Sequence, residues 1–312
     1  MSTVHTVALP TEATPHHHAS HHASHRTHPP LRPEVEHPLE PFTASALTLP
    51  LPWHRRLWAH SSLRRALWLL LLTALWEGVA RWQNNDLLLP TAGQTLRALV
   101  EGVGSGELLL KAALSLEVLL KGYVLGVVAA LAFTSAAVST QAGRDLLATL
   151  TAMFNPLPAI ALLPLALLWF GLGQGSLIFV LVHAVLWPVA LATHAGFEAV
   201  PDTLRMAGRN YGLGGLRYVL FILVPSALPA ILSGLRIGWA FAWRTLIAAE
   251  LVFGATSGQG GLGWYIFQNR NELYTDRVFA GLLMVIGIGL LVEGLVFNTA
   301  ERITVRRWGM QR

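Results

Sequence analysis

The sequence has no cysteine and little charge, and each shortage argues against a class of protein. Without cysteine among its 312 residues, the chain has no disulfide, no thiolate nucleophile and no cysteine-ligated iron–sulfur site. Charged residues make up 12% of the chain, against about 25% in soluble domains. Hydrophobic residues make up 53%. So few charged residues cannot cover the surface of a water-soluble globular protein, and the composition argues against a soluble enzyme.

Lysine is scarcer still, because Lys111 and Lys121 are the only two in the chain. A phosphate-binding P-loop requires Gly-Lys-Ser/Thr, since its lysine must reach the β- and γ-phosphates. Both lysines here follow a leucine, so the chain contains no P-loop and a partner must hydrolyse any ATP. The net charge of +5 does not indicate a nucleic-acid partner, because the basic residues lie beside hydrophobic runs, where membrane topology needs them.

Long apolar runs are what the sequence has in abundance. They are of helix length, unlike the segments of about ten alternating residues in an outer-membrane barrel, and about 20 apolar residues cross a bilayer as a helix. We therefore expect an all-α, polytopic membrane protein with six transmembrane helices. The expected spans are 66–82, 112–138, 152–170, 175–195, 229–253 and 278–300.

A glycine-rich turn separates the third and fourth spans, and prolines lie within both of them. The segment Gly171–Gly175 is a tight turn between the third and fourth spans. Prolines are expected to kink these two helices and to free backbone carbonyls that line a cavity. The prolines are Pro156, Pro158, Pro164 and Pro188.

Residues 1–52 differ in composition from the transmembrane domain expected at 53–312. Nine of the 13 histidines lie within the first 37 residues and nine of the 17 prolines within the first 52. Proline, histidine, serine and threonine with few aliphatic residues cannot bury enough surface to fold, so we expect a disordered cytoplasmic tail. No cleavable apolar core, and hence no secretory signal, is expected in it. The alternative is a metal-chelating arm made of His16, His17, His18, His21, His22 and His25.

The distribution of arginine and lysine predicts the orientation in the membrane. Within residues 53–312, twelve basic residues lie before the first span, between spans two and three, between spans four and five, and after the sixth. Five lie on the opposite side. By the positive-inside rule, both termini are cytoplasmic. An even number of helices agrees with this orientation.

The segment at about 196–228 is too polar to cross the bilayer and too regularly patterned for a slack loop. A helix is expected to begin at Pro201, with Asp202 or Thr203 capping its free N–H groups. Glycines at 212, 214 and 215 interrupt the helix, which resumes from Leu216 to Val224. A helix–glycine–helix unit on the cytoplasmic face indicates a docking element for another protein.

The spacing within this segment carries a family resemblance. Nine residues separate Gly212 from Ile222, and Pro225 follows. Three residues separate the triplet Met206-Ala207-Gly208 from Gly212. This pattern resembles the cytoplasmic loop of permeases from binding-protein-dependent ABC importers, which reads Glu-Ala-Ala, three residues, Gly, nine residues, Ile, one residue, Leu-Pro. The chain departs from it with Met206 for Glu, Gly208 for the second Ala and Val224 for Leu.

Further segments are similar to the alkanesulfonate, nitrate and taurine permeases of that family, and the resemblance covers about residues 85–300. The segments are Leu88-Leu89-Pro90, Pro156–Ile160, Pro164-Leu165, Trp169–Gly173, Ala248-Ala249-Glu250 and Gly260–Gly263.

The resemblance implies a type I ABC importer permease fold and a division of labour. The chain would be a transport subunit with no enzymatic activity and no cofactor of its own, in the bacterial inner membrane. ATP and Mg would be bound by cytoplasmic ABC ATPase subunits that contact the coupling loop. A periplasmic or lipid-anchored binding protein would deliver a sulfonate, taurine or nitrate-type anion. A second copy of the permease would complete the pathway as a homodimer among membrane lipids.

Charged residues within the spans are candidates for this pathway. A charge at the bilayer centre costs about 2.5–3.5 kcal/mol on insertion scales and is normally kept for a pathway or an ion pair. Arg244 and Glu250 are six residues apart, so they lie about 120° from a common helix face and do not neutralise each other. Arg244 could attract a planar or trigonal oxyanion; the alternative is a bond to backbone carbonyls. Pro164 is a third candidate, whereas Glu250 fits a gate or a packing role.

Other polar residues in the spans have structural explanations. Glu117 and Lys121 are four residues apart with the acid first, so they are expected to pair on one helix. His183 and His194 are about 16 Å apart along a helix, too far for direct proton transfer, and are expected to be packing residues. Arg236 and Glu293 are further charges within the spans.

Two other functions stay open at this stage. A secondary transporter driven by an ion gradient would call for inverted repeats, and residues 60–170 show no convincing resemblance to 175–300. A membrane scaffold would use the polar loop as a docking site and leave the arginines structural. Copurification of a stoichiometric ATPase separates the importer from both.

Overall fold

The computed structural model describes residues 61–253 and 260–306, and the regular structure within these ranges is entirely helical. The all-α prediction is therefore confirmed. The histidine-rich segment 1–52 lies outside the described residues, so the metal-arm alternative stays a hypothesis.

Three continuous helices are long and apolar enough to cross a membrane. They are α4 (Glu107–Ala137), α7 (Gln174–Glu198) and the helix that runs from α13 (Thr275–Leu291) through η4 (Val292–Phe297) and α14 (Asn298–Glu301) into η5 (Arg302–Arg306). Two pairs of helices bent at a short break pass the same test. They raise the count to five if each pair is one span.

The expected count of six is therefore not reached by length and composition. The first expected span, 66–82, lies in α2 (Ser61–Gln83), which is helical but is not among the helices that pass. Its apolar run is short, and Glu77 and Arg81 lie on its last turns, where they form an ion pair of 2.7 Å.

The third expected span, 152–170, is not a single helix. Helix α5 (Gln141–Phe154) ends just inside it, and η2 (Ala159–Leu162) with α6 (Leu163–Phe170) continues at 88° to α5. Pro156 and Pro158 explain the break, because proline lacks the N–H donor that would continue the helix and its ring clashes with the preceding turn. Pro164 lies in the first turn of α6, where proline is tolerated, and Pro188 lies inside the continuous α7. These two prolines do not break a helix.

Helices α4 and α7 pack closely because α4 presents small residues at regular spacing. Gly122, Gly126, Ala130 and Thr134 recur every four residues and are all buried. A Cβ atom on Gly122 would lie 2.5 Å from the Cβ of Leu181 on α7. Small residues at such spacing let helix backbones approach within a membrane, where lipid supplies no hydrophobic drive for association.

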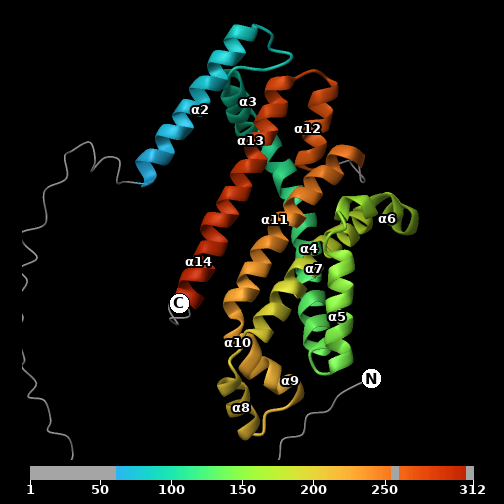
Figure 1. Cartoon of the computed structure of the whole chain (residues 1–312). Coiled ribbons are helices and arrows are strands. Elements are labelled where there is room, and N and C mark those ends of the chain that lie inside the picture. Colours follow the sequence, from blue (N-terminus) through green and yellow to red (C-terminus); the bar gives the residue numbers. More distant parts are fainter. Residues whose placement is uncertain (1–60, 254–259, 307–312) are drawn as a thin grey trace, which may run out of the picture. The chain divides into compact units, whose positions relative to one another are not determined.

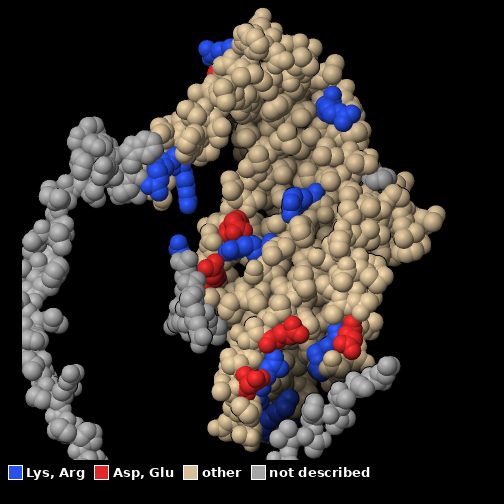
Figure 2. Space-filling view, in the orientation of Figure 1, with Lys and Arg blue, Asp and Glu red and all other residues tan. Residues whose placement is uncertain are grey.

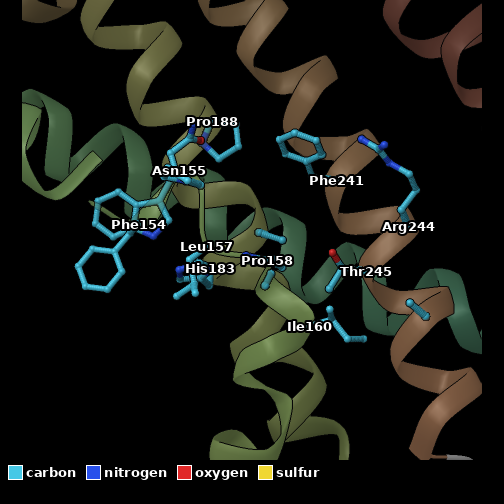
Figure 3. A pocket seen from close by; sticks show the side chains of 15 residues that line it. Phe154, Asn155, Leu157, Pro158, Ile160, His183, Pro188, Phe241, Arg244 and Thr245 are labelled. Atoms are coloured by element: carbon cyan, nitrogen blue, oxygen red, sulfur yellow. The ribbon is translucent and has the colours of Figure 1, made fainter. Parts of the chain in front are cut away.

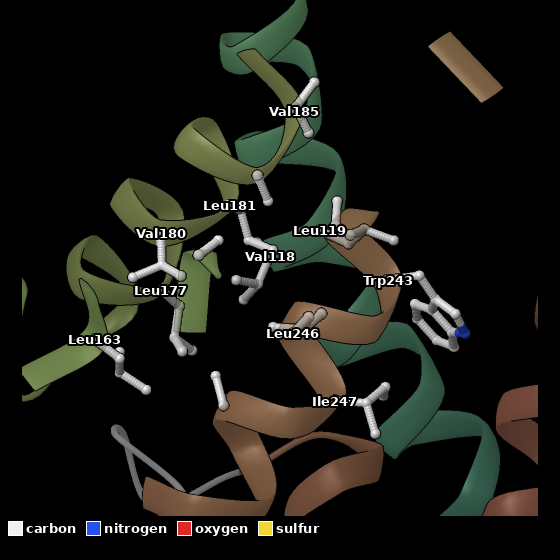
Figure 4. Close-up of a cluster of buried hydrophobic side chains, with 14 of the residues drawn as sticks. Val118, Leu119, Leu163, Leu177, Val180, Leu181, Val185, Trp243, Leu246 and Ile247 are labelled. Atoms are coloured by element: carbon white, nitrogen blue, oxygen red, sulfur yellow. The ribbon is translucent and has the colours of Figure 1, made fainter. Parts of the chain in front are cut away.

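Helix α11 (Leu228–Phe253) approaches α7 in the same way, further along that helix. A Cβ on Gly234 would lie 2.6 Å from the Cβ of Ala192, and a Cβ on Gly238 would lie 3.0 Å from Cγ2 of Val189. The apolar cluster between α4, α7 and α11 is the core, and Figure 4 shows Leu119, Leu181 and Leu246 turned toward one another within it.

The helices that connect the spans gather at two ends (Figure 1). One end, named here the α8 end, carries α8 (Asp202–Asn210), α9 (Gly215–Tyr218), η3 (Val219–Leu223) and α10 (Val224–Ser226). The other carries α3 (Ala92–Gly104) and α12 (Leu262–Asn271). A hydrogen bond from the Thr275 hydroxyl to the Leu87 carbonyl, 2.9 Å long, joins the connections at this second end.

Substitution of Gly122 should test the close approach of α4 and α7. We expect Gly122→Val to lower the melting temperature of the purified chain by several degrees, because overpacking a tight contact costs about 1–3 kcal/mol. Gly78→Val in α2 is the matched control, since no atom lies within 4 Å of its Cβ position. Equal melting temperatures for the two variants would contradict the packing described here.

Candidate functional site

A cavity of about 380 Å³ lies where the break after α5 meets α7 and α11. Figure 3 shows Asn155 and Pro158 from the break, His183 and Pro188 from α7, and Arg244 from α11 around it. Its walls are largely apolar and aromatic, with a few polar groups among them. Small-ligand sites commonly have this character, because apolar walls give contact area and a few polar groups fix orientation.

Arg244 is the one positively charged residue that lines this cavity. Its Nε donates to the Ala240 carbonyl of its own helix at 3.0 Å, and its guanidinium carbon lies 4.9 Å from the centre of the Phe241 ring. No carboxylate pairs with it within the described residues. A guanidinium has five N–H donors. Four of them remain for other acceptors, so the side chain is equipped to bind an oxyanion.

The histidines of α7 do not form a pair. His183 lines the Arg244 cavity and packs against the rings of Phe154 and Trp187, each with a centroid 6.2 Å away. His194 lies nearer the α8 end, with Nε2 at 3.8 Å from a carboxylate oxygen of Glu198.

The structure separates the other two pathway candidates from Arg244. Neither Glu250 nor Pro164 lines the Arg244 cavity. Pro164 begins α6, whereas Glu250 is buried in a contact between α4, α11 and α12. Of the three residues singled out from the sequence, Arg244 alone lines this cavity.

Glu250 holds the start of α12 in place. The Ser115 hydroxyl on α4 lies 3.0 and 2.9 Å from the two carboxylate oxygens of Glu250. The amide of Leu262 donates to the Ser115 oxygen, and the amide of Gly263 donates to Glu250, each at 2.8 Å. These are first-turn amides with no partner inside their own helix. A carboxylate at a helix N-terminus also interacts favourably with the helix dipole.

This contact explains the glycines that precede and begin α12. A Cβ atom on Gly263 would lie 2.5 Å from the Cβ of Glu250 and 2.7 Å from the Ile247 carbonyl oxygen. A side chain at this position would therefore push α12 away from the carboxylate that caps it.

The polar segment between α7 and α11 forms the helix–glycine–helix unit expected from its sequence. Helix α8 begins at Asp202, but the expected cap is wrong, because neither Asp202 nor Thr203 makes a capping hydrogen bond. Arg205 fixes the segment instead. It donates to the Val200 carbonyl at 3.0 Å and to the Phe197 carbonyl at 2.6 Å. These carbonyls lie at the end of α7, where a cation is favoured by the helix dipole.

Gly212 turns the chain between the two helices. Its φ angle of +73° lies in the left-handed region, which glycine adopts readily and β-branched residues do not. Its amide donates to the Arg209 carbonyl at 2.9 Å, and the next amide, of Leu213, donates to the Gly208 carbonyl at 3.1 Å. These two bonds close the end of α8.

The two halves of the loop motif meet in space. A Cβ atom on Gly208 would lie 2.8 Å from Cγ1 of Ile222, so these residues pack directly together. Met206, on the same helix, is 56% exposed. Leu204 and Tyr211 are exposed as well, and Met206 stands where the resembling family has an acidic residue.

Two groups of charged side chains are structural. Glu117 and Lys121 form the expected pair, with 2.6 Å between Oε1 and Nζ. Arg236 forms ion pairs of 3.1 Å with Glu293 and 3.2 Å with Glu301, which tie α11 to the last helix. The sequence showed Arg236 and Glu293 as intramembrane charges of opposite sign, but it did not show that they pair. Charged residues gather at the α8 end in Figure 2.

Comparison with known proteins agrees with this geometry. Residues 122–305, more than half of the chain, match the family described as binding-protein-dependent transport system inner membrane component. The chain is 30% identical over 72% of its length to a protein of Methanocaldococcus jannaschii, provisionally named an ABC transporter permease, and covers 84% of that protein.

The chain spans about half the length of two relatives whose names state a solute. The chain is 36% identical to the taurine transport system permease of Escherichia coli over 48% of this chain and 53% of that protein. It is 31% identical to the nitrate import permease of a Synechocystis species over 49% of this chain and 54% of that protein.

Removal of the Glu250 carboxylate should free the start of α12. We expect Glu250→Ala to speed hydrogen exchange at the Leu262 and Gly263 amides by about tenfold or more, because an unsatisfied buried group costs about 1–3 kcal/mol. Glu250→Gln keeps an acceptor oxygen and should retain part of the protection. Glu117→Ala, which removes an exposed carboxylate, should leave both amides unchanged. Exchange unaffected by Glu250→Ala would show that the carboxylate does not cap α12.

Proposed function

The chain belongs to the family of inner membrane components of binding-protein-dependent transport systems, a family of permease subunits and not of enzymes, and we propose that it forms the pathway of an ATP-driven importer for a small anion. The observation that carries this proposal is Arg244, exposed in a largely apolar cavity between three elements and without a carboxylate partner in the described part of the chain. An unpaired cation within a span is costly and is normally kept for function.

The chemistry of the cavity favours an oxyanion. A guanidinium fork matches the oxygens of sulfonate, carboxylate or nitrate. Asn155 and Thr245 add an amide and a hydroxyl to the lining, while Phe241 and Trp187 give apolar contact for an organic group. Relatives named for taurine and for nitrate support an anion, and between the two we favour a sulfonate such as taurine.

The α8 segment is the proposed contact with the ATPase. Met206-Ala207-Gly208, Gly212, Ile222 and Pro225 occupy the positions of the family loop, and the packing of Gly208 against Ile222 supports this assignment. Since Met206 replaces the acidic residue, we propose that the ATPase is held here by apolar contact with the exposed side chains of Leu204, Met206 and Tyr211. ATP and Mg are assigned to that partner, because both lysines lack a P-loop context.

The family implies further partners. A solute-binding protein delivers the anion on the side opposite the α8 end, and a second permease subunit, a further copy of this chain in our proposal, completes the pathway. The structure supports the charge-derived orientation, because Arg144 and Arg205 line one cavity, which brings the connections after α4 and after α7 to the same end. We therefore propose that the α8 end is cytoplasmic and that the protein lies in the bacterial inner membrane.

Import of labelled taurine and nitrate by a gene-deletion strain tests the proposed function. The wild-type chain should restore import of one of them. Arg244→Ala should lower import by about tenfold or more, which corresponds to about 1.4 kcal/mol of lost anion binding. Arg244→Lys should retain part of the activity because it keeps the charge. Arg81→Ala, which removes an exposed arginine paired with Glu77, is the control. Wild-type import by Arg244→Ala at equal membrane abundance would refute the pathway role.

A change at Gly212 should separate ATP hydrolysis from import. We expect Gly212→Val to leave an ATPase bound in the purified complex but to lower the anion imported per ATP hydrolysed, because a β-branched residue resists the left-handed conformation. Gly212→Asn should be milder, since asparagine tolerates that conformation. No neighbouring atom lies within 4 Å of the Cβ position, so the effect isolates the backbone. A chain that copurifies with no ATPase would instead favour the secondary transporter or the scaffold.

A further inference from the structure

Two further cavities continue from the Arg244 cavity toward the α8 end. A middle cavity of about 240 Å³ lies between α5 and α7 and shares Asn155 and Pro156 with the Arg244 cavity. A third cavity of about 730 Å³ shares His194 with the middle one. The three therefore lie in a row along α7, from the break after α5 to the α8 segment, and each shares lining residues with the next.

The third cavity is strongly basic, and we name it the arginine basin. Arg144 from α5 and Arg205 and Arg209 from α8 line it, while Glu198 is the one acidic residue in its lining. Three cations against one carboxylate leave a net positive charge. A concave site with charges of one sign raises the local concentration of counter-ions.

The arginines of the basin keep unused donors. Arg144 donates to the Val138 carbonyl at 2.8 Å and to the Gln141 amide oxygen at 2.6 Å. Arg205 uses Nε and Nη2 on carbonyls near the end of α7. In the ranges that the structure describes, Arg209 makes no side-chain hydrogen bond or ion pair. Each guanidinium has five N–H donors. All donors of Arg209, and some of those of Arg144 and Arg205, are therefore available to a ligand in the basin.

The middle cavity carries buried polar groups that make no hydrogen bond to any described residue. The hydroxyl of Thr151 and Nε2 of His194 are buried and make no hydrogen bond within the described part of the chain. Both residues line this cavity, which is otherwise formed by small and apolar side chains such as Ala148 and Ala152. Buried polar groups are normally bonded, so unpaired ones beside a cavity indicate that a hydrated or polar occupant completes them.

We propose that the arginine basin is a second binding site for the anion, reached from Arg244 through the middle cavity. The inference rests on the proposed import function. Its ligand is a small oxyanion, because guanidinium groups match oxygens of sulfonate or nitrate. In ion channels, binding must be strong enough to admit an ion and weak enough, or spread over enough sites, to release it. The basin supplies the next attractive site after Arg244, and Asn155, Thr151 and His194 lie between them.

The absence of cysteine makes a labelling test direct. Ala152 and its chain neighbour Met153 are both exposed, but Ala152 lines the middle cavity and Met153 lies outside the three cavities, so Met153→Cys is the matched control for Ala152→Cys. The full-length chain in membrane vesicles is treated with anionic 2-sulfonatoethyl or cationic trimethylammonioethyl methanethiosulfonate, and modification is followed by mass. We expect the anionic reagent to modify Ala152→Cys faster than the cationic one, and Met153→Cys to react slowly with both.

The contribution of the basin is measured by adding Arg209→Gln to Ala152→Cys. The anionic rate should fall by about threefold or more, as expected for removal of one nearby charge, while the cationic rate should not fall. Arg209→Lys should preserve the anionic rate. Sodium ethanesulfonate should slow the anionic reagent more than the bulkier sodium gluconate at equal ionic strength, and Arg209→Gln should remove that protection.

Equal reactivity at the two cysteines, an anionic rate indifferent to Arg209→Gln, or no protection by ethanesulfonate would each overturn the second site. Labelling requires no transport, so the outcome is independent of the import assay. If the chain imports the anion but the expected labelling pattern is absent, the proposed function stands and the basin is refuted as a binding site. The labelling pattern in a chain that imports nothing would refute the proposed function alone.

Discussion

The close approach of α4, α7 and α11 through glycine and alanine is the constraint on which the rest of the structure depends. Gly122 and Gly126 bring α4 against α7 near Leu181 and Val185, and Gly234 and Gly238 bring α11 against it near Val189 and Ala192. Within a membrane such contacts are stabilised by dispersion and close packing, since lipid is as apolar as the side chains. A fixed α7 then aligns the three cavities, because each of them takes part of its lining from this helix.

Charged groups within the spans are accommodated in three different ways. Glu250 is buried and caps α12, Arg236 is paired with Glu293 and Glu301, and Arg244 remains available in a cavity. The first two arrangements compensate the charge locally, which is what an apolar surrounding demands. For Arg244, the compensating charge would come from an anion bound in the cavity. This difference is the physical basis for assigning function to Arg244 and structure to the other two.

The break after α5 and the segment at the α8 end show how far local sequence rules reach. Proline chemistry predicted a disturbance at Pro156 and Pro158 but not the turn of 88°. The start of α5 at Gln141 has a local cause, because the Thr140 hydroxyl caps the helix by accepting from the Gly143 amide. Glycine spacing predicted the helix–glycine–helix unit. Its anchor is Arg205 bonded to the carbonyls that end α7, and not a cap at Asp202 or Thr203, because α8 begins directly after those carbonyls.

The sequence by itself determined the membrane class, the all-helical architecture, the absence of a P-loop and the helix–glycine–helix segment, because these follow from composition and from spacing along one chain. Tertiary structure alone decided which polar residues share a space. Arg144 and Arg209 are 65 positions apart and line one basin, whereas Arg244 and Glu250 lie on one helix and serve separate sites. Helix periodicity gives the direction of a side chain around its own axis, but the partner that it meets depends on how the helices pack.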